Sequence, residues 1–506
     1  MKNTHSTPQS PRLPGESRRA NIKDQSSTRV EESPRLVGGF FKPNVILISI
    51  DTLRADHLSC YGYQRRTTPN IDRLAEDAVL FENAYSTAAW TPPAHASMLT
   101  GRYPSFHGVV DTGRLGREIP TLAEALRAGG YRTAGFVNNS QVGELVGLEK
   151  GHEAFVEVWK GTAGMSLLRR GMDYLVRNAK DRVGLADHGA DRTNRLVRSW
   201  LREKGDQPFY LFIHYIEPHN PINAPHPFKN KFREHPDNRN IDRKKLDCVA
   251  DNPLNCYTRG IRLNADEIAA LKALYDGEVN YIDHKLGELL DYLKKERIYD
   301  NSLIIVTADH GEHFGEHDLY SHVASLYEPI LRIPLIIKYP EGFHRQTRVA
   351  ELVQLVDIFP TVVETAGLDR KFGEGVQGTS LVKTDSNGRY HDFIVSEWEG
   401  RVPHFVQKRM NGRDLDPVIN KFKESLVMIR EGRYKFISNS NGREELYDLA
   451  ADRGELTNLI EREQETAADM RAKLTRWRSL NRPVVHEDRA RLDEATRKNL
   501  ESLGYL

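Results

Sequence analysis

Short apolar runs rich in β-branched residues recur along the chain and predict buried strands. The first, residues 45–50, is apolar at every position except Ser49, as in a strand that is covered on both faces. Four similar runs follow, at residues 133–137, 209–214, 303–307 and 333–337. Helical spacing of apolar residues lies between them and is longest over residues 265–295. Strands that alternate with helices predict an α/β fold with a doubly wound, mainly parallel sheet.

The pattern changes beyond residue 400, where shorter elements predict a second, smaller unit. Residues 425–430 and 434–437 have the pattern of a β-hairpin, and residues 465–480 have that of a helix. We therefore expect a catalytic α/β domain over residues 43–400 and a C-terminal α+β subdomain over residues 401–506.

Two polar segments are expected to lie outside the packed core. Residues 1–40 are rich in Ser, Pro, Arg and Glu and predict a disordered tail. Residues 220–262 are crowded with Pro, Asn, Asp and Arg and predict a long surface excursion, with a lid over the site as one alternative.

Composition bears on which partners the protein can bind and on the compartment in which it is found. The chain has 72 Lys and Arg against 71 Asp and Glu, so no broad basic face argues for a nucleic acid. Its three cysteines form no C-x-x-C pair, which favours a reducing compartment over a disulfide framework. No stretch has the roughly 18–20 apolar residues of a membrane span, and no signal peptide is evident at the start. A cytoplasmic location is therefore expected.

Polar residues with metal-binding chemistry follow two of the predicted strands. Asp51 comes directly after the first strand, and Asp309 and His310 follow the strand at residues 303–307. Doubly wound sheets bind ligands at the carboxyl ends of their strands. Thr91, which opens a Thr-Pro-Pro segment, adds a hydroxyl. This set suits one divalent ion, Mg²⁺, Mn²⁺, Ca²⁺ or Zn²⁺, which would activate Thr91 as a nucleophile.

Several histidines lie near the same strand ends, and Thr91 has a second interpretation. His214, His219 and His322 could bind an anionic group or protonate a leaving oxygen. Thr91 before two prolines is also typical of a helix N-cap. The two interpretations are compatible, because a helix N-terminus is itself an anion site.

Motifs in a fixed order resemble the sulfatase family of the alkaline phosphatase superfamily over about residues 43–480. The similar segments are residues 43–58 (PNVILISIDTLRADHL), 97–104 (SMLTGRYP), 307–312 (TADHGE), 445–449 (ELYDL) and 455–459 (ELTNL). The resemblance implies an alkaline-phosphatase-like α/β fold with a C-terminal α+β subdomain.

The resemblance also implies roles for single residues. Asp51, Asp309 and His310 would bind the metal, and Thr91 would be the nucleophile at the metal. Three histidines would contact the substrate or act as leaving-group acids: His219, His322 and His107.

Three departures from the family pattern bear on the expected chemistry. Thr91 stands where sulfatases have the Cys or Ser that becomes formylglycine, His95 stands for an arginine, and Thr52 stands for a second aspartate. Because threonine is not a source of formylglycine, we expect hydrolysis of phosphate mono- or diesters through a covalent intermediate on Thr91. The alternatives are a sulfuric ester hydrolase, a phospho-group transferase and a non-catalytic binding protein on the same fold.

The expected substrate is a small-molecule, glycan-linked or lipid-linked anionic ester. The sequence leaves open its identity, the identity of the metal and the oligomeric state.

Overall fold

The computed structural model describes residues 42–110, 113–161, 184–233, 240–341, 347–382, 389–400, 418–480 and 493–503. The tail expected at residues 1–40 lies outside the described residues.

An eight-stranded sheet forms the centre of the molecule. Its strands are, in spatial order, β10 (Thr347–Gln354), β2 (Val79–Tyr85), β9 (Arg332–Lys338), β6 (Ser302–Thr307), β1 (Asn44–Ile50), β5 (Phe209–Tyr215), β3 (Arg132–Val137) and β4 (Ala154–Glu157). Only β9 runs antiparallel to its neighbours, β2 and β6, so the sheet is mainly parallel. All five predicted runs are strands of this sheet, and the predicted α/β fold class is confirmed.

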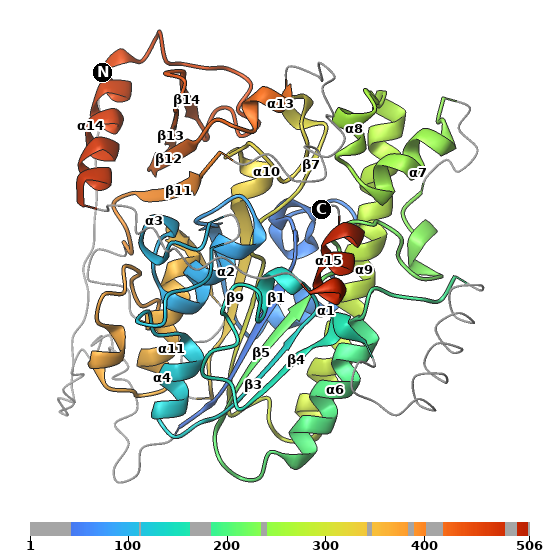
Figure 1. Ribbon diagram of the computed structural model, residues 1–506, viewed down its shortest axis with the longest axis vertical. Coiled ribbons are helices and arrows are strands. Elements are labelled where there is room, and N and C mark those ends of the chain that lie inside the picture. The colour runs from blue at the N-terminus through green and yellow to red at the C-terminus, as the bar shows by residue number, and fades with distance from the viewer. Residues whose placement is uncertain are drawn as a thin grey trace, which may run out of the picture. The chain divides into compact units, whose positions relative to one another are not determined.

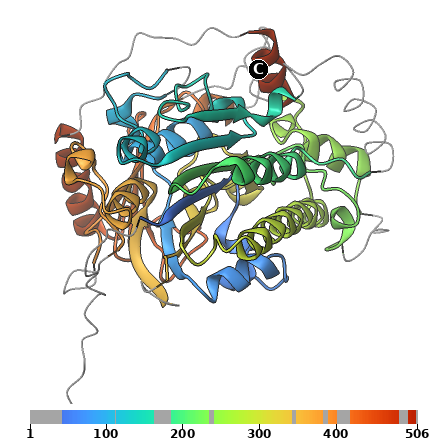
Figure 2. The same ribbon diagram turned by 90° about the horizontal axis from the view of Figure 1, so that it is seen from below.

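Helices cover both faces of the sheet (Figures 1 and 2). One layer contains α2 (Thr91–Thr100), α4 (Leu122–Ala128) and α11 (Ile358–Thr365), and the other contains α1 (Pro69–Ala75), α6 (Ala190–Glu203) and α9 (Ala265–Lys295). The helix α9 has the bounds that its apolar spacing predicts. It begins at a capping box in which Asn264 and Glu267 satisfy each other's backbone N–H groups.

A smaller antiparallel sheet forms the C-terminal subdomain. It contains β11 (Ile394–Trp398), β12 (Leu426–Glu431), β13 (Tyr434–Asn439) and β14 (Glu444–Asp448). The helix α14 (Gln464–Leu480) packs on β12 and β13, and the hairpin and the helix are both where the sequence predicts them. The strand β11 precedes residue 400, so the small sheet starts before the expected domain boundary.

Shorter elements connect these layers. They are α3 (Pro104–His107), α7 (Arg243–Asp251), α8 (Asn255–Thr258), β7 (His313–Phe314), β8 (Tyr320–Ser321), α10 (Glu328–Leu331), α13 (Val418–Lys421) and α15 (Glu494–Ser502). The helices α7 and α8 belong to the segment expected as a surface excursion, and α7 packs on α9. Among the described residues, no helix combines the length and the apolar character that a bilayer span requires.

Candidate active site

The carboxyl ends of β1 and β6 bring two aspartates together. The strands are parallel neighbours, and Ser49 lies opposite Thr307 in their register. Asp51 and Asp309, each two residues further on, therefore emerge side by side from the same edge of the sheet. Between them Thr52 adopts a left-handed backbone conformation (φ 56°), and its N–H donates to Asp309 Oδ1 at 3.2 Å.

Three buried ligand atoms at this edge fit a divalent cation. Asp51, Asp309 and His310 each offer one, and these atoms lie within 4.8 Å of one another. Asp51 Oδ1 and Asp309 Oδ2 are buried carboxylate oxygens without a hydrogen-bond partner among the residues that the structure describes. The Nδ1–H of His310 donates to Gly311 O at 2.9 Å, so Nε2 is the nitrogen that faces the two carboxylates and would coordinate the metal. Buried anionic oxygens beside a fixed imidazole are donors that suit a divalent metal.

The pKa values of Asp51 and His310 are shifted because the charged groups of the site are buried close together. Burial and the nearby charge of Asp309 raise the pKa of Asp51. Burial alone would lower the pKa of His310, but Asp309 and then Asp51 outweigh it and raise that pKa to about 9. The two carboxylates therefore draw positive charge toward the point between them.

Thr91 lies at the start of α2 and faces this group. Its Oγ1 is 3.1 Å from His310 Nε2. Thr91 is the first helical residue, whereas the N-cap position is Trp90, which makes no side-chain cap bond. The structure therefore does not support an N-cap role for Thr91. The hydroxyl instead lies where the N-terminus of a helix and the candidate metal ligands meet.

His95, which stands where the family has an arginine, is a neutral supporting residue. Its Nδ1–H donates to Thr91 O at 2.9 Å, and its Nε2 accepts from the hydroxyl of Ser49 at 2.9 Å. Burial lowers its pKa to about 4, although Asp309 lies only 3.4 Å from Nδ1. His95 thus ties the first turn of α2 to β1.

Two of the three expected substrate histidines lie beside the candidate metal ligands. The ring of His322 is 4.6 Å from that of His310 and 5.2 Å from that of His219, measured between centroids. His322 Nδ1 is 3.2 Å from Glu312 Oε2, and His219 Nδ1 donates to Asn220 O at 2.8 Å. Burial, and then the charge of His310, lower the pKa of His322 to about 3. Both rings are fixed by hydrogen bonds at Nδ1.

His107, the third histidine, makes its hydrogen bonds on another side of α2. Its Nε2–H donates to Pro93 O at 3.2 Å and lies 3.1 Å from Ser97 Oγ, while Nδ1 accepts from Val109 N–H at 3.0 Å. These bonds tie His107 to the body of α2, so they support a structural role better than the expected substrate contact.

Asn139 is a residue of the site that the sequence reasoning missed. Its Nδ2 donates to Asp51 Oδ2 at 3.0 Å, and His214 Nε2 lies 3.3 Å from the same oxygen. Asn139 follows the carboxyl end of β3 by two residues. Its position after a predicted strand was the available signal, the same one that pointed to Asp51.

The central sheet, the flanking helices and this buried cluster define an ester hydrolase of the alkaline phosphatase type. The family model for Sulfatase matches residues 43–368, and the model for the C-terminal region of N-sulphoglucosamine sulphohydrolase matches residues 315–480. The chain belongs to the sulfatase family, as the motifs of the sequence indicate.

Individual relatives are similar over most of the chain. A choline-sulfatase of Rhizobium meliloti is 26% identical, with 90% of this chain and 89% of the relative covered. A multifunctional alkaline phosphatase superfamily protein of Trinickia caryophylli is also 26% identical, with 83% and 91% covered. The solved phosphonate monoester hydrolase of Agrobacterium radiobacter has a TM-score of 0.67 at 23% identity, with 87% and 96% covered, and shares the fold.

Proposed function

We propose that this chain hydrolyses phosphate mono- or diesters, with the Thr91 hydroxyl as the nucleophile. The observation that carries the proposal is the position of Thr91 Oγ1, 3.1 Å from His310 Nε2. It lies beside two buried carboxylate oxygens that have no hydrogen-bond partner in the described part of the chain. Asp51, Asp309 and His310 would hold a divalent ion, which supplies Lewis-acid stabilisation to the developing negative charge when it is bound.

The reaction needs two displacements at phosphorus. In the first, the Thr91 hydroxyl releases its proton, Oγ forms a bond to phosphorus, and the bond to the leaving oxygen breaks, so that this oxygen takes up one proton for the one that Thr91 releases. His322 and His219 would bind the anionic group. Burial lowers the pKa of both imidazoles, and the negative charge of the bound group would raise it again, so that one of them would protonate the leaving oxygen. In the second, water attacks phosphorus, the bond to Thr91 breaks, and phosphate or its monoester leaves while Thr91 regains its proton.

Threonine favours phosphate over sulfate as the substrate. A formylglycine hydrate can expel sulfate with its second hydroxyl by re-forming the aldehyde, whereas Thr91 has one oxygen and lacks this exit. The relatives include a choline-sulfatase and a phosphonate monoester hydrolase, which supports both ester classes, so the nucleophile is the feature that separates them. Sulfuric ester hydrolysis is the alternative.

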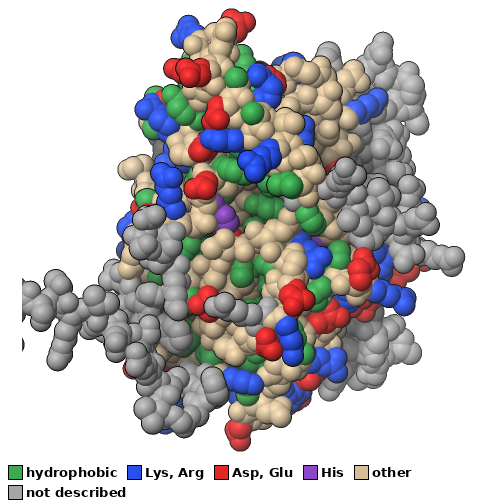
Figure 3. Space-filling view, turned by 90° about the vertical axis from the view of Figure 1, so that its left-hand side faces the viewer, with side chains coloured by type: hydrophobic (Ala, Val, Ile, Leu, Met, Phe, Trp, Pro, Cys, Tyr) green, Lys and Arg blue, Asp and Glu red, His purple; other side chains and the backbone are tan. Residues whose placement is uncertain are grey.

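Surface charge bears on the class of substrate, and the cysteines bear on the location of the protein. On the face shown in Figure 3, basic and acidic side chains are interspersed, without a continuous basic stripe for a nucleic acid. Cys60, Cys248 and Cys256 are free thiols, which supports the proposed cytoplasmic location.

The test compares 4-nitrophenyl phosphate, bis-4-nitrophenyl phosphate and 4-nitrophenyl sulfate at saturating Mg²⁺, Mn²⁺, Ca²⁺ and Zn²⁺. We expect turnover of a phosphate ester, a loss on the order of 10³-fold or more in Thr91→Ala, and partial activity in Thr91→Ser. Mass spectrometry of quenched enzyme should place a phosphoryl group on Thr91.

Thr100 gives the matched control at the other end of the same helix, where its hydroxyl donates to Ala96 O. Thr100→Ala and Thr100→Ser should retain most activity. Efficient multiple turnover of the sulfate ester with both phosphate esters untouched would contradict the proposal.

A further inference from the structure

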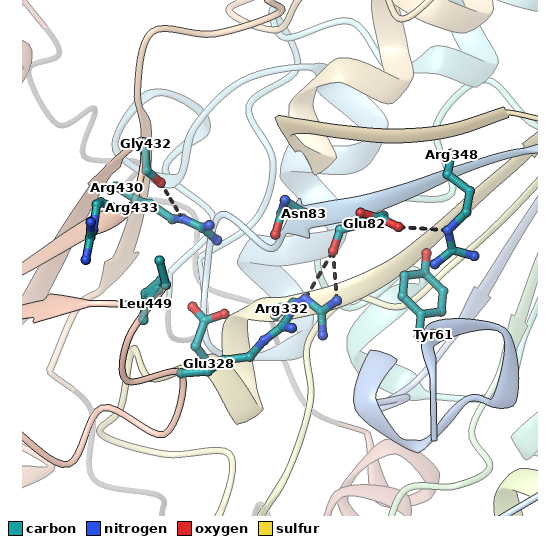
Figure 4. A pocket seen from close by; sticks show the side chains of 12 residues that line it. Tyr61, Glu82, Asn83, Glu328, Arg332, Arg348, Arg430, Gly432, Arg433 and Leu449 are labelled. Carbon is teal, nitrogen blue, oxygen red and sulfur yellow. Dashed lines mark hydrogen bonds and ion pairs between the residues drawn. The ribbon is translucent and has the colours of Figure 1, made fainter. Parts of the chain in front are cut away.

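A basic pocket lies away from the metal ligands, between the two sheets. The cavity has a volume of about 450 Å³ and is lined by residues of β2, β9 and β10 on one side and of the C-terminal subdomain on the other (Figure 4). Its basic side chains are Arg332, Arg348, Arg430, Arg433 and Arg453.

Two of these arginines already have carboxylate partners. Arg348 Nε is 2.7 Å from Glu82 Oε1, and Arg433 pairs with Asp448. The remaining acidic group of the pocket, Glu328, is also engaged, by the ammonium group of a buried lysine and by a tyrosine hydroxyl. The acidic side chains that line the pocket therefore leave part of its positive charge uncompensated.

The other three arginines have no carboxylate within ion-pair distance among the described residues. Arg332 donates from Nε and Nη2 to the backbone oxygen of Glu82, and Arg430 donates from Nε to Gly432 O at 3.4 Å. Arg453 lies on an exposed turn beside them. In Figure 4, Arg430 reaches in from β12 and Arg332 from β9, on opposite sides of the cavity.

Arg430 is the unusual member of this group. It is only 8% exposed, and its guanidinium carbon lies 4.8 Å from the centre of the Tyr85 ring. Burial and the charge of Arg453 lower the pKa of Arg430 to about 10. Burial and the charge of Arg332 lower the pKa of Arg453 as well. A bound anion would offset both the repulsion between these arginines and the cost of burying the Arg430 charge.

We propose that this pocket binds a multiply charged oxyanion that carries phosphoryl or sulfuryl groups. Guanidinium groups donate pairs of hydrogen bonds to such oxygens, and three guanidinium groups without carboxylates match more than one negative charge. A cavity of about 450 Å³ has room for a ligand larger than a single ion.

The pocket is separate from the metal site and independent of the proposed function. None of its lining residues is a candidate metal ligand. The short helix α10 links the two sites: Glu328 lines the pocket, while Ile330 O accepts from Gly311 N–H at 2.7 Å beside His310. Because the pocket lining and the candidate metal ligands share no residue, binding at one site can be measured with the other disabled.

The experiment is calorimetric titration of the full chain with inorganic pyrophosphate at fixed ionic strength. Arg453→Gln and Arg430→Gln should each weaken binding by about 10-fold, the value of one charge-assisted hydrogen bond. Arg471→Gln is the matched control, because this exposed arginine of α14 pairs with Glu444 outside the pocket. Asp309→Ala, which disables the metal site, should retain the binding that Arg453→Gln loses.

A second arm identifies the source of the anion. Tighter binding of a sulfated dextran oligosaccharide than of pyrophosphate would assign the pocket to charged groups on a larger molecule, and the reverse order would assign it to free polyanions. Pyrophosphate binding that is absent, unchanged by Arg453→Gln and Arg430→Gln, or abolished by Asp309→Ala alone would overturn the proposal. Thermal unfolding of each variant without ligand separates loss of binding from loss of fold.

Discussion

Replacing Asn139 with Ala tests the proposed metal site without changing a metal ligand. The Nδ2 of Asn139 donates to Asp51 Oδ2 at 3.0 Å, and this bond turns the other oxygen, Oδ1, toward Asp309 and His310. Without it, Asp51 can rotate and loses its fixed orientation. A hydrogen bond to a buried charged group contributes about 1.5–3 kcal/mol, so metal affinity should fall about 10–100-fold.

The assay is titration of metal into chelator-treated protein, followed by calorimetry and by recovery of activity. At saturating metal, kcat should return to within a few-fold of wild type, because the Asn139 side chain donates its hydrogen bond to the candidate metal ligand Asp51. Asn138→Ala is the matched control, since this neighbouring side chain donates to His188 O at 2.6 Å instead. Unchanged or tighter metal binding in Asn139→Ala, or a loss of kcat that excess metal does not restore, would refute the reasoning.

Two further predictions concern His322 and a buried ion pair. His322→Ala should slow turnover by roughly 10²–10⁴-fold for esters with poor leaving groups and by less for nitrophenyl esters. Initial rates measure both losses, and equal losses would indicate that His322 binds the substrate without protonating the leaving group. Lys435→Met should destabilise the fold by about 3–5 kcal/mol in urea unfolding, because it leaves Glu455 and Glu328 buried without their cation. Burial raises the pKa of Glu455 to about 7 even beside Lys435, and loss of this cation should raise it further. The folded variant therefore keeps this proton to a higher pH than folded wild type does, and its deficit in stability should grow as pH rises through about 7. A variant as stable as wild type at pH 8 would contradict this.

The elements that the sequence predicts are those whose local pattern matches their final environment. The strand β1 is buried on both faces, and α9 carries its own capping box, so each appears in a short window of sequence. The strand β2 was missed because polar Glu82 and Asn83 interrupt its apolar run. In the structure these two residues fall at a register shift in the pairing with β9, and they line the arginine-rich pocket.

The sequence of a strand does not determine whether it pairs parallel or antiparallel with its neighbours. Residues 333–337 have the same apolar pattern as the parallel strands, yet β9 runs antiparallel to both neighbours. A central strand is covered on both faces in either direction, so its burial pattern is the same. Only the path of the connecting chain decides the direction.

The candidate site could be predicted as a set of residues but not as a geometry. Asp51 and Asp309 can be chosen from the sequence because each follows an apolar run. That they lie side by side depends on the pairing of β1 with β6, which the sequence alone does not give. The helix that presents Thr91 is buried at all ten of its positions, so it lacks the polar face by which an amphipathic helix is recognised. Its placement against His310 follows from the packing of the whole domain. The same placement would serve a hydrolase of either ester class, so the choice between phosphate and sulfate depends on the single oxygen of Thr91.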